Sequence, residues 1–233
     1  MATVLLVRHG RSGANQRGVL AGRSPGVLLD EEGEAQAAAT AKRIAGLPIR
    51  VVVSSPLERC LQTAQAIAAE LGKPLDVRVD DRFIECGYGD WTGEELKKLA
   101  KDPLWKVVQG HPSAATFPAG ESIRDMQSRA LSAARDWDAT VSREHGAQAL
   151  WVAVSHGDVI KSILADALGA HLDNFQRIVV DPASVSVVTY TPLRPFVVRF
   201  NEHGDLKGLA PPGRSRRRKV PSSDAAVGGG AGS

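Results

Sequence analysis

The stretches TVLLVRHG (residues 3–10) and WVAVSHG (residues 151–157) decide the fold. Each is a short run of mostly apolar residues, which is typical of a strand buried on both faces of a sheet. Each ends in a histidine followed by a glycine. In an open parallel sheet, ligands bind outside the carboxyl ends of the strands. We therefore expect His9 and His156 to emerge at one edge of a sheet, where each glycine lets the backbone approach a ligand.

The chain between and after these stretches alternates apolar runs with longer segments of helical periodicity. The remaining strands are expected at residues 49–53, 75–79, 178–180, 185–190 and 196–200. Helices are expected at residues 31–45, 56–71, 120–143 and 158–168. Strands separated by helices of this length predict an α/β fold, with a mainly parallel sheet, helices on both faces and an antiparallel edge.

Two segments do not follow the alternation. Residues 83–118 contain several glycines, two tryptophans and three prolines, and we interpret residues 86–118 as a lid over a site. Residues 211–233 contain RSRRRK and a Gly-rich end without apolar periodicity, which predicts a disordered basic tail. The globular domain is therefore expected to span residues 1–210.

Charge and cysteine content exclude several classes of protein. The net charge is +3, but residues 211–233 hold five of the 29 bases and one of the 26 acids, so residues 1–210 carry a net charge of −1. Specific nucleic-acid binding by the domain is therefore not expected. Two cysteines, Cys60 and Cys86, exclude a disulfide scaffold and indicate the cytoplasm. No apolar run reaches the ~20 residues of a membrane span, and the N-terminus does not resemble a signal peptide.

A cationic cluster without metal-ligand spacing is expected at the strand ends. The strand at 49–53 leads through Ser54-Ser55-Pro56 to Arg59 in the first turn of a helix, where an anion is already favoured. Arg8, Arg59, His9 and His156 suit a phosphoryl group with its charged oxygens. No HExxH, CxxC or paired-aspartate pattern is present, so we expect no metal and no cofactor. The other histidines lack this setting and are expected at the surface or in the lid: His111, His145, His171 and His203.

These residues belong to a longer set of motifs. The set comprises Val7-Arg8-His9-Gly10 with Ser12 and Asn15, Leu29-Asp30-Glu31-Glu32-Gly33, Ser54 to Arg59 with Gln62-Thr63-Ala64, Glu85 with Gly89 to Gly93, Pro118 to Ser122, and Ser155-His156-Gly157. Across about residues 3–200, the chain resembles the histidine phosphatase superfamily, whose members are phosphoglycerate mutase-like. The resemblance implies a three-layer α/β/α sandwich.

The resemblance also implies a two-step mechanism. His9 becomes a phosphohistidine, and the charge of the phosphoryl group is stabilised by Arg8, Arg59 and His156. Glu85 protonates the leaving oxygen and then activates water. Further contacts to the phosphoryl group or substrate are implied for Asn15, Gly22 and Gly157.

Two positions depart from the family pattern. Arg11 replaces a frequent glutamate and is expected to add positive charge at the mouth of the site. Gly87 replaces a frequent aspartate, which leaves the local loop geometry open. Cys86, beside Glu85, is interpreted as a small packed side chain rather than a redox-sensitive thiol.

The reading that we favour is a phosphatase acting on small phosphorylated metabolites. The lid offers Lys97, Lys98, Lys101 and Lys106 but no arginine, whereas the family's mutases are expected to hold a second phosphate with arginines. The alternatives are a phosphoglycerate mutase-type phosphomutase, a catalytically silent phospho-ligand binder and a nucleic-acid binder that uses the tail. A homodimer is left open.

Overall fold

The computed structural model describes residues 1–72 and 75–210, and its centre is one mixed sheet of six strands. The strands are β1 (Thr3–Arg8), β2 (Ile49–Ser54), β3 (Val77–Val79), β4 (Leu150–Ser155), β5 (Val185–Tyr190) and β6 (Pro195–Glu202). Their order is β3-β2-β4-β1-β5-β6. The first four strands are parallel, whereas β5 pairs antiparallel with both β1 and β6. The expected antiparallel edge is therefore present.

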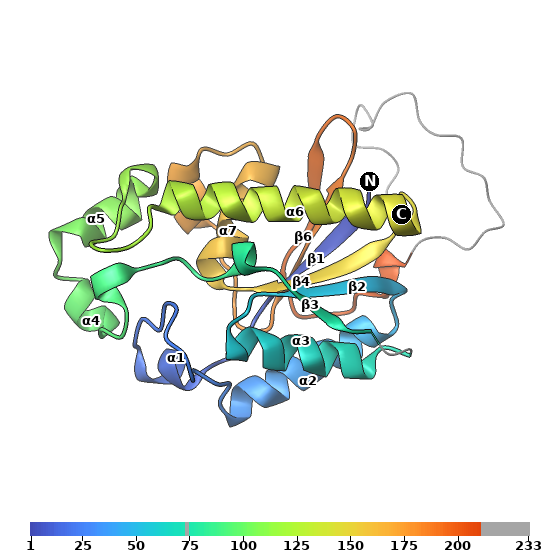
Figure 1. Cartoon of the computed structure of the whole chain (residues 1–233), viewed down its shortest axis with the longest axis horizontal. Helices are drawn as coiled ribbons and strands as arrows, with labels where there is room; N and C mark the ends of the chain where they lie inside the picture. The colour runs from blue at the N-terminus through green and yellow to red at the C-terminus, as the bar shows by residue number, and fades with distance from the viewer. Residues whose placement is uncertain (73–74, 211–233) are drawn as a thin grey trace.

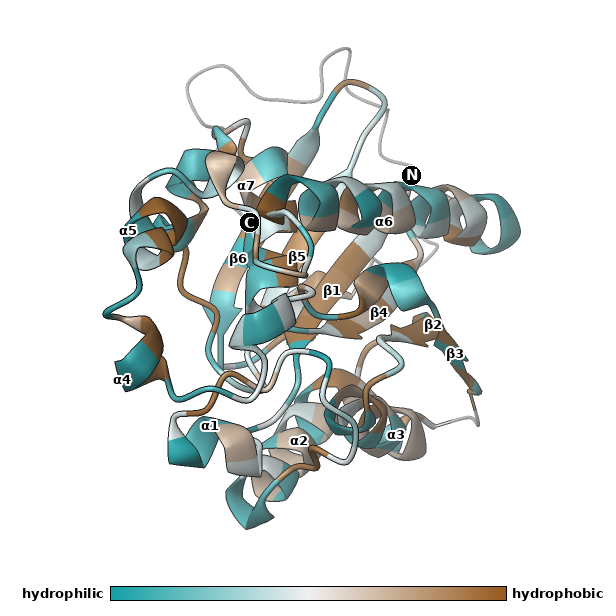
Figure 2. Ribbon diagram, turned by 60° about the vertical axis from the view of Figure 1, so that its left-hand side comes forward, coloured by the Kyte–Doolittle hydropathy of each residue, from teal (hydrophilic) through white to brown (hydrophobic). Residues whose placement is uncertain are grey.

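Helices cover both faces of the sheet, as Figure 1 shows. On one side lie α2 (Glu31–Ala45) and α3 (Glu58–Glu70), and on the other lie α6 (Ile123–His145) and α7 (Gly157–Ala167). The strands alternate between the two cores: Val4 and Leu6 of β1 belong to the α6/α7 side, and Leu5 and Val7 to the α2/α3 side. Figure 2 shows the apolar strands enclosed between helices whose outer faces are hydrophilic. The three-layer sandwich is thus confirmed.

Most element boundaries agree with expectation to within a few residues, and two predictions were wrong. Residues 178–180 form a loop rather than a strand, and the Val180 carbonyl accepts from Arg8 Nη1 at 2.7 Å instead of from a neighbouring strand. The helix expected to begin at Pro56 begins at Glu58. The Ser55 hydroxyl, which we expected at a helix start, contacts His156 instead.

The remaining helices are short and lie at the end of the molecule where the parallel strands finish (Figure 1). They are α1 (Gly13–Arg17), α4 (Leu96–Leu99) and α5 (Pro103–Gly110). Within residues 86–118 the chain forms α4, α5 and two 3-10 turns joined by loops. The predicted tail, residues 211–233, lies outside the described residues. No helix in the described ranges is long and apolar enough to cross a membrane.

Candidate active site

Three parallel strands deliver the central residues to one edge of the sheet. β1 ends at Arg8 and leads to His9, and its neighbour β4 ends at Ser155 and leads to His156. β2, on the far side of β4, leads through Ser55 to Arg59 in the first turn of α3. The register pairs Arg8 with Ser155, so the two histidines follow matched positions. Their rings lie edge to face, with centroids 5.2 Å apart.

A cavity of about 490 Å³ opens at this edge. Of the eight residues that the sequence singled out, seven line it: Arg8, His9, Asn15, Gly22, Arg59, Glu85 and Gly157. The eighth, His156, is fully buried behind them. α7 begins at Gly157, so the N-terminus of this helix faces the cavity, where its unpaired N–H groups favour an anion.

His9 is held as a neutral imidazole with its reactive nitrogen facing the cationic cluster. Its Nδ1 lies 2.7 Å from the Gly10 carbonyl oxygen. A carbonyl oxygen only accepts, so Nδ1 carries the proton and Nε2 keeps a lone pair. Arg59 Nε donates to that lone pair at 3.3 Å. Burial, followed by the charges of Arg59 and Arg8, lowers the pKa of His9 well below its usual value. The ring therefore stays unprotonated and nucleophilic in mildly acidic solution.

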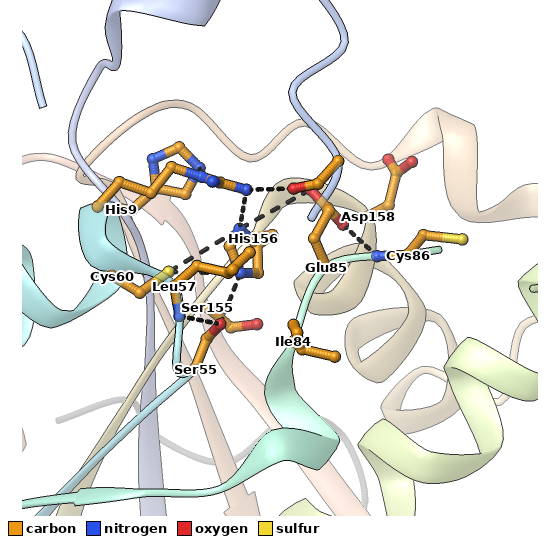
Figure 3. Close-up of polar contacts among 12 residues, drawn as sticks. His9, Ser55, Leu57, Cys60, Ile84, Glu85, Cys86, Ser155, His156 and Asp158 are labelled. Carbon is orange, nitrogen blue, oxygen red and sulfur yellow. Dashed lines mark hydrogen bonds and ion pairs between the residues drawn. The ribbon is translucent and has the colours of Figure 1, made fainter. Parts of the chain in front are cut away.

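His156 is also neutral, and its neighbours define which nitrogen carries the proton. Arg59 Nη2 donates to Nδ1 at 3.3 Å, so Nε2 is protonated and donates to the Ser55 hydroxyl at 2.8 Å (Figure 3). The Cys60 sulfur lies 3.5 Å from Nε2, and burial raises the pKa of that thiol to about 12. Burial and the charge of Arg59 lower the pKa of His156 well below its usual value.

Two guanidinium nitrogens at the site have no hydrogen-bond partner among the described residues. They are Arg8 Nε and Arg59 Nη1. The rest of each guanidinium is fixed, because Arg8 Nη1 donates to the Val180 carbonyl at 2.7 Å and Arg59 Nη2 donates to the Gly22 carbonyl at 2.8 Å. A buried donor without an acceptor costs on the order of 1–3 kcal/mol, and more when the donor is charged. An anion in the cavity supplies the missing acceptors.

Glu85 is a carboxyl group adapted to hold a proton near neutral pH. Burial, with a further contribution from the negative charge of Asp158, raises its pKa to about 7. Figure 3 shows the two carboxyl groups as neighbours. Glu85 Oε2 lies 3.8 Å from His156 Nδ1, and Glu85 Oε1 accepts from the Cys86 N–H at 2.9 Å. The side chain thus reaches His156 within the cavity.

The backbone of Glu85 is held by a network that the sequence reasoning missed. Its carbonyl oxygen accepts from Arg23 Nε at 2.8 Å and from Arg129 Nη2 at 3.1 Å. Both arginines also bind the carboxylate of Glu121, which accepts the Gly87 N–H at 3.1 Å as well. This carboxylate orders the loop around Gly87, the position that departs from the family pattern. Glu121 stands in a quoted motif, but no local signal links it to arginines 98 and 8 residues away.

Two glycines have different roles from one another. Gly22 has a φ of +50°, and a Cβ there would lie 2.9 Å from Thr92 Oγ1 and 3.2 Å from the Tyr88 ring, so the turn that presents its carbonyl to Arg59 requires glycine. Gly10, which we expected to approach a ligand, instead lies against helix α2, where a Cβ would overlap the Gly33 carbonyl. That part of the expectation was wrong.

The expectation that Arg11 adds charge at the mouth was also wrong. Arg11 forms ion pairs with Asp30 at 2.8 Å and with Glu32 at 2.9 Å, and it does not line the cavity. Asn15 does line it, and its Oδ1 accepts from the N–H and hydroxyl of Ser12 at 3.1 and 2.9 Å. The amide nitrogen is therefore the group that Asn15 can offer a ligand. Cys86 is fully buried, and burial raises its pKa, as expected of a packed thiol.

The lysines of the lid are exposed, and none lines the cavity: Lys97, Lys98, Lys101 and Lys106. The cavity instead contains a lysine that the sequence reasoning missed, Lys161 on α7. It lies one helical turn after Asp158, so the spacing of the pair was visible in the sequence. The sequence did not show that the Lys161 side chain points into the site, because both faces of α7 carry buried residues.

Comparison with known proteins gives one consistent family. The model of the "Histidine phosphatase superfamily (branch 1)" matches residues 4–203. Phosphoserine phosphatase 1 of Hydrogenobacter thermophilus is 31% identical over 207 residues, which cover 86% of this chain and 92% of that protein. A 2,3-bisphosphoglycerate-dependent phosphoglycerate mutase of Thermoplasma acidophilum is 29% identical over 188 residues, which cover 81% and 87%.

Solved structures agree in fold. A mycobacterial glucosyl-3-phosphoglycerate phosphatase, determined in complex with VO3, superposes with a TM-score of 0.77 at 25% identity, covering 85% of this chain and 98% of that one. Other relatives are longer: the chain spans about half the length of three mycobacterial proteins that are 35% identical over 190 residues.

Proposed function

The chain belongs to the histidine phosphatase superfamily, and on that premise we propose that it hydrolyses phosphomonoesters of small metabolites through a phosphohistidine at His9. An enzyme of the phosphoglycerate mutase-like phosphatase type agrees with the relatives of this chain. The observation that carries the proposal is that two buried nitrogens, Arg8 Nε and Arg59 Nη1, have no hydrogen-bond partner among the described residues and line the same cavity as a neutral His9. Within the described part of the chain neither arginine forms an ion pair with a carboxylate, and two such arginines around a nucleophile fit a dianionic phosphoryl group.

In the first step, the lone pair of His9 Nε2 attacks phosphorus and the bond to the ester oxygen breaks. The hydrogen bond from Arg59 Nε to His9 Nε2 breaks, and Arg59 Nε donates to a phosphoryl oxygen instead. Arg8 Nε and Arg59 Nη1 donate to the other phosphoryl oxygens. Glu85, with its pKa raised to about 7, gives its proton to the leaving oxygen, so the product departs as a neutral alcohol. The proton stays on His9 Nδ1 throughout, where it is hydrogen-bonded to the Gly10 carbonyl oxygen.

In the second step, water attacks phosphorus and the bond to Nε2 breaks. The Glu85 carboxylate takes the proton of the water, which restores the acid, and inorganic phosphate leaves. His156 contributes once the phosphoryl group raises its pKa, because a proton on Nδ1 turns it from an acceptor into a donor. Asn15 offers its amide nitrogen, and Gly157 its backbone N–H at the start of α7.

Hydrolysis is favoured over phosphomutase activity by the cations of the cavity. Arg8 and Arg59 are committed to one phosphoryl group, and the lysines of the lid are exposed. Lys161, the remaining cation among the described lining residues, has a carboxylate partner in Asp158. Phosphoglycerate mutase activity is the second candidate, because one relative of this chain is a phosphoglycerate mutase. We place the enzyme in the cytoplasm, since its two cysteines are free thiols, which suits a reducing compartment.

The test is a panel of phosphomonoesters with p-nitrophenyl phosphate as the general reporter. Hydrolysis is expected for the wild type and is expected to be lost in His9→Ala. His145→Ala, an exposed histidine, is the matched control and should retain wild-type rates. A wild-type protein that binds phosphate but turns over no ester would identify a silent binder. Sustained conversion of 3-phosphoglycerate to 2-phosphoglycerate well above hydrolysis would identify a mutase.

A further inference from the structure

The cavity is much larger than one phosphoryl group, and its outer part has two unlike sides. Its volume of about 490 Å³ is within the range of sites that enclose whole small ligands. The arginines and histidines lie at the inner end. The rest of the lining includes apolar residues, such as Val19, Leu20 and Trp105, which we call the apolar side, and polar residues, Asp158, Lys161 and Gln176, which we call the polar side. The alcohol part of a substrate would meet both sets of residues.

The charge of Lys161 is already compensated within the protein. Its ammonium group lies 3.7 Å from Asp158 Oδ1 and 3.1 Å from Gln176 Oε1. It also lies 5.8 Å from the centre of the Phe175 ring, over its face. Both side chains of the ion pair are mostly shielded, with 20% of Lys161 and 24% of Asp158 exposed, so solvent weakens the pair less than it weakens a surface ion pair.

Asp158 is itself held in place on its other oxygen. The hydroxyl of Tyr88 donates to Oδ2 at 2.8 Å, and Tyr88 is buried against the Phe117 ring. Asp158 therefore presents a fixed negative charge beside the general acid, since its carboxyl group neighbours that of Glu85 (Figure 3). A second anionic group on the substrate would meet this charge, with Lys161 already paired.

We propose that this enzyme selects phosphomonoesters of uncharged, partly apolar alcohols, and that Asp158 is the specificity-determining residue that disfavours substrates with a second phosphate or a carboxylate. The proposal rests on the phosphatase function and names its substrate class. The apolar side packs against the alcohol, and the polar side hydrogen-bonds its hydroxyl groups. Repulsion from a carboxylate fixed by Tyr88 excludes anionic alcohols.

The experiment compares two esters that differ in one charge, glycerol 3-phosphate and 3-phosphoglycerate. For the wild type, kcat/KM is expected to be about tenfold higher for glycerol 3-phosphate. Asp158→Asn is expected to bring the ratio close to one, because it frees Lys161 to bind the carboxylate. Adding Lys161→Gln to that variant removes both charges of the pair, so the ratio should lie between that of the wild type and that of Asp158→Asn. Asp76→Asn, at an exposed position, should keep the wild-type ratio.

Each ratio is taken within one variant at its own pH optimum, so a change in the ionisation of Glu85 affects both esters alike. A wild-type preference for 3-phosphoglycerate would overturn the proposal, and so would a ratio that Asp158→Asn leaves unchanged. Both outcomes differ from a failure of the proposed function, in which no variant hydrolyses p-nitrophenyl phosphate in a His9-dependent manner.

Discussion

The inner and outer ends of the cavity are built in contrasting ways. At the inner end, strand ends and helix starts position fully buried side chains, such as His156 and Arg59. The outer end is formed by loops, the short helices α4 and α5, and side chains that are partly exposed, such as Trp105 and Lys161. The ends of regular elements hold most of the groups that every phosphomonoester requires, whereas the outer end combines loops and short helices with Asp158 and Lys161 of α7. Substitutions at the two ends should therefore have different kinetic signatures.

Among substitutions at the two ends, Glu85→Gln should lower activity most, because the glutamine amide cannot protonate the leaving oxygen. We expect kcat for alkyl phosphates to fall by about 10²–10⁴. The loss should be much smaller for p-nitrophenyl phosphate, whose leaving group needs little protonation. Glu70→Gln, at the exposed end of α3, is the matched control. An equal loss for both kinds of ester would contradict the acid role.

Arg59→Lys comes next in magnitude and tests whether the inner end needs a guanidinium rather than a charge. Lysine keeps the charge but cannot bind His9, His156, Gly22 and a phosphoryl oxygen together. We expect kcat/KM to fall by about 10² for every ester, charged or uncharged. Arg50→Lys, an exposed arginine on β2, should have no effect. A loss confined to some esters would place Arg59 in substrate selection instead.

Asp158→Asn should shift the pH dependence of kcat/KM, although Asp158 lies beside the inner end of the cavity and is not part of that end. The basic limb of kcat/KM is expected near pH 7, since Glu85 must be protonated and its pKa is about 7. The acidic limb should lie well below pH 6.5, because His9 must be unprotonated and its pKa is lowered. Removing the charge of Asp158 favours the Glu85 carboxylate, so the basic limb should move to lower pH and the rate at neutral pH should fall several-fold.

The wild type and Asp158→Asn are compared on the same ester, so the ionisation of the ester affects both pH profiles alike. A basic limb that stays in place, or moves to higher pH, would show that Asp158 does not act on Glu85.

Trp105→Ala should give the smallest change and affect only the outer end. Trp105 stacks on Trp91, with ring centroids 6.0 Å apart, and aromatic contacts of this kind contribute about 0.5–1.5 kcal/mol. We expect KM for esters with apolar alcohols to rise about threefold to tenfold with little change in kcat. Inhibition by inorganic phosphate, which fills the inner end alone, is the internal control and should not change.

The two ends also differ in how far the sequence predicts them. The strand ends at His9 and His156 follow from apolar runs that stop at a His-Gly pair, a local pattern, and the structure brings these residues together with Arg59. The start of α3 could not be predicted in the same manner, because the Ser55 hydroxyl contacts His156, 101 residues away, and the helix begins only at Glu58.

Misjudged charges have a similar physical cause. Arg11 reads as a free cation until the fold brings Asp30 and Glu32 against it. Neither Lys161 nor Asp158 stands out in the sequence, because only the fold brings Gln176 and Tyr88 against them. Ion pairs between distant segments depend on tertiary packing, which carries no local periodicity.

Trapping the phosphoenzyme tests the central claim most directly. The wild type, mixed with ³²P-labelled substrate and quenched in alkali, should carry label on His9 that survives alkali and is lost in acid, as expected of a phosphorus–nitrogen bond. Glu85→Gln should accumulate more label with an activated ester, because water attack is slowed, and His9→Ala should carry none. Label that survives acid, or label that persists in His9→Ala, would contradict a phosphohistidine at His9.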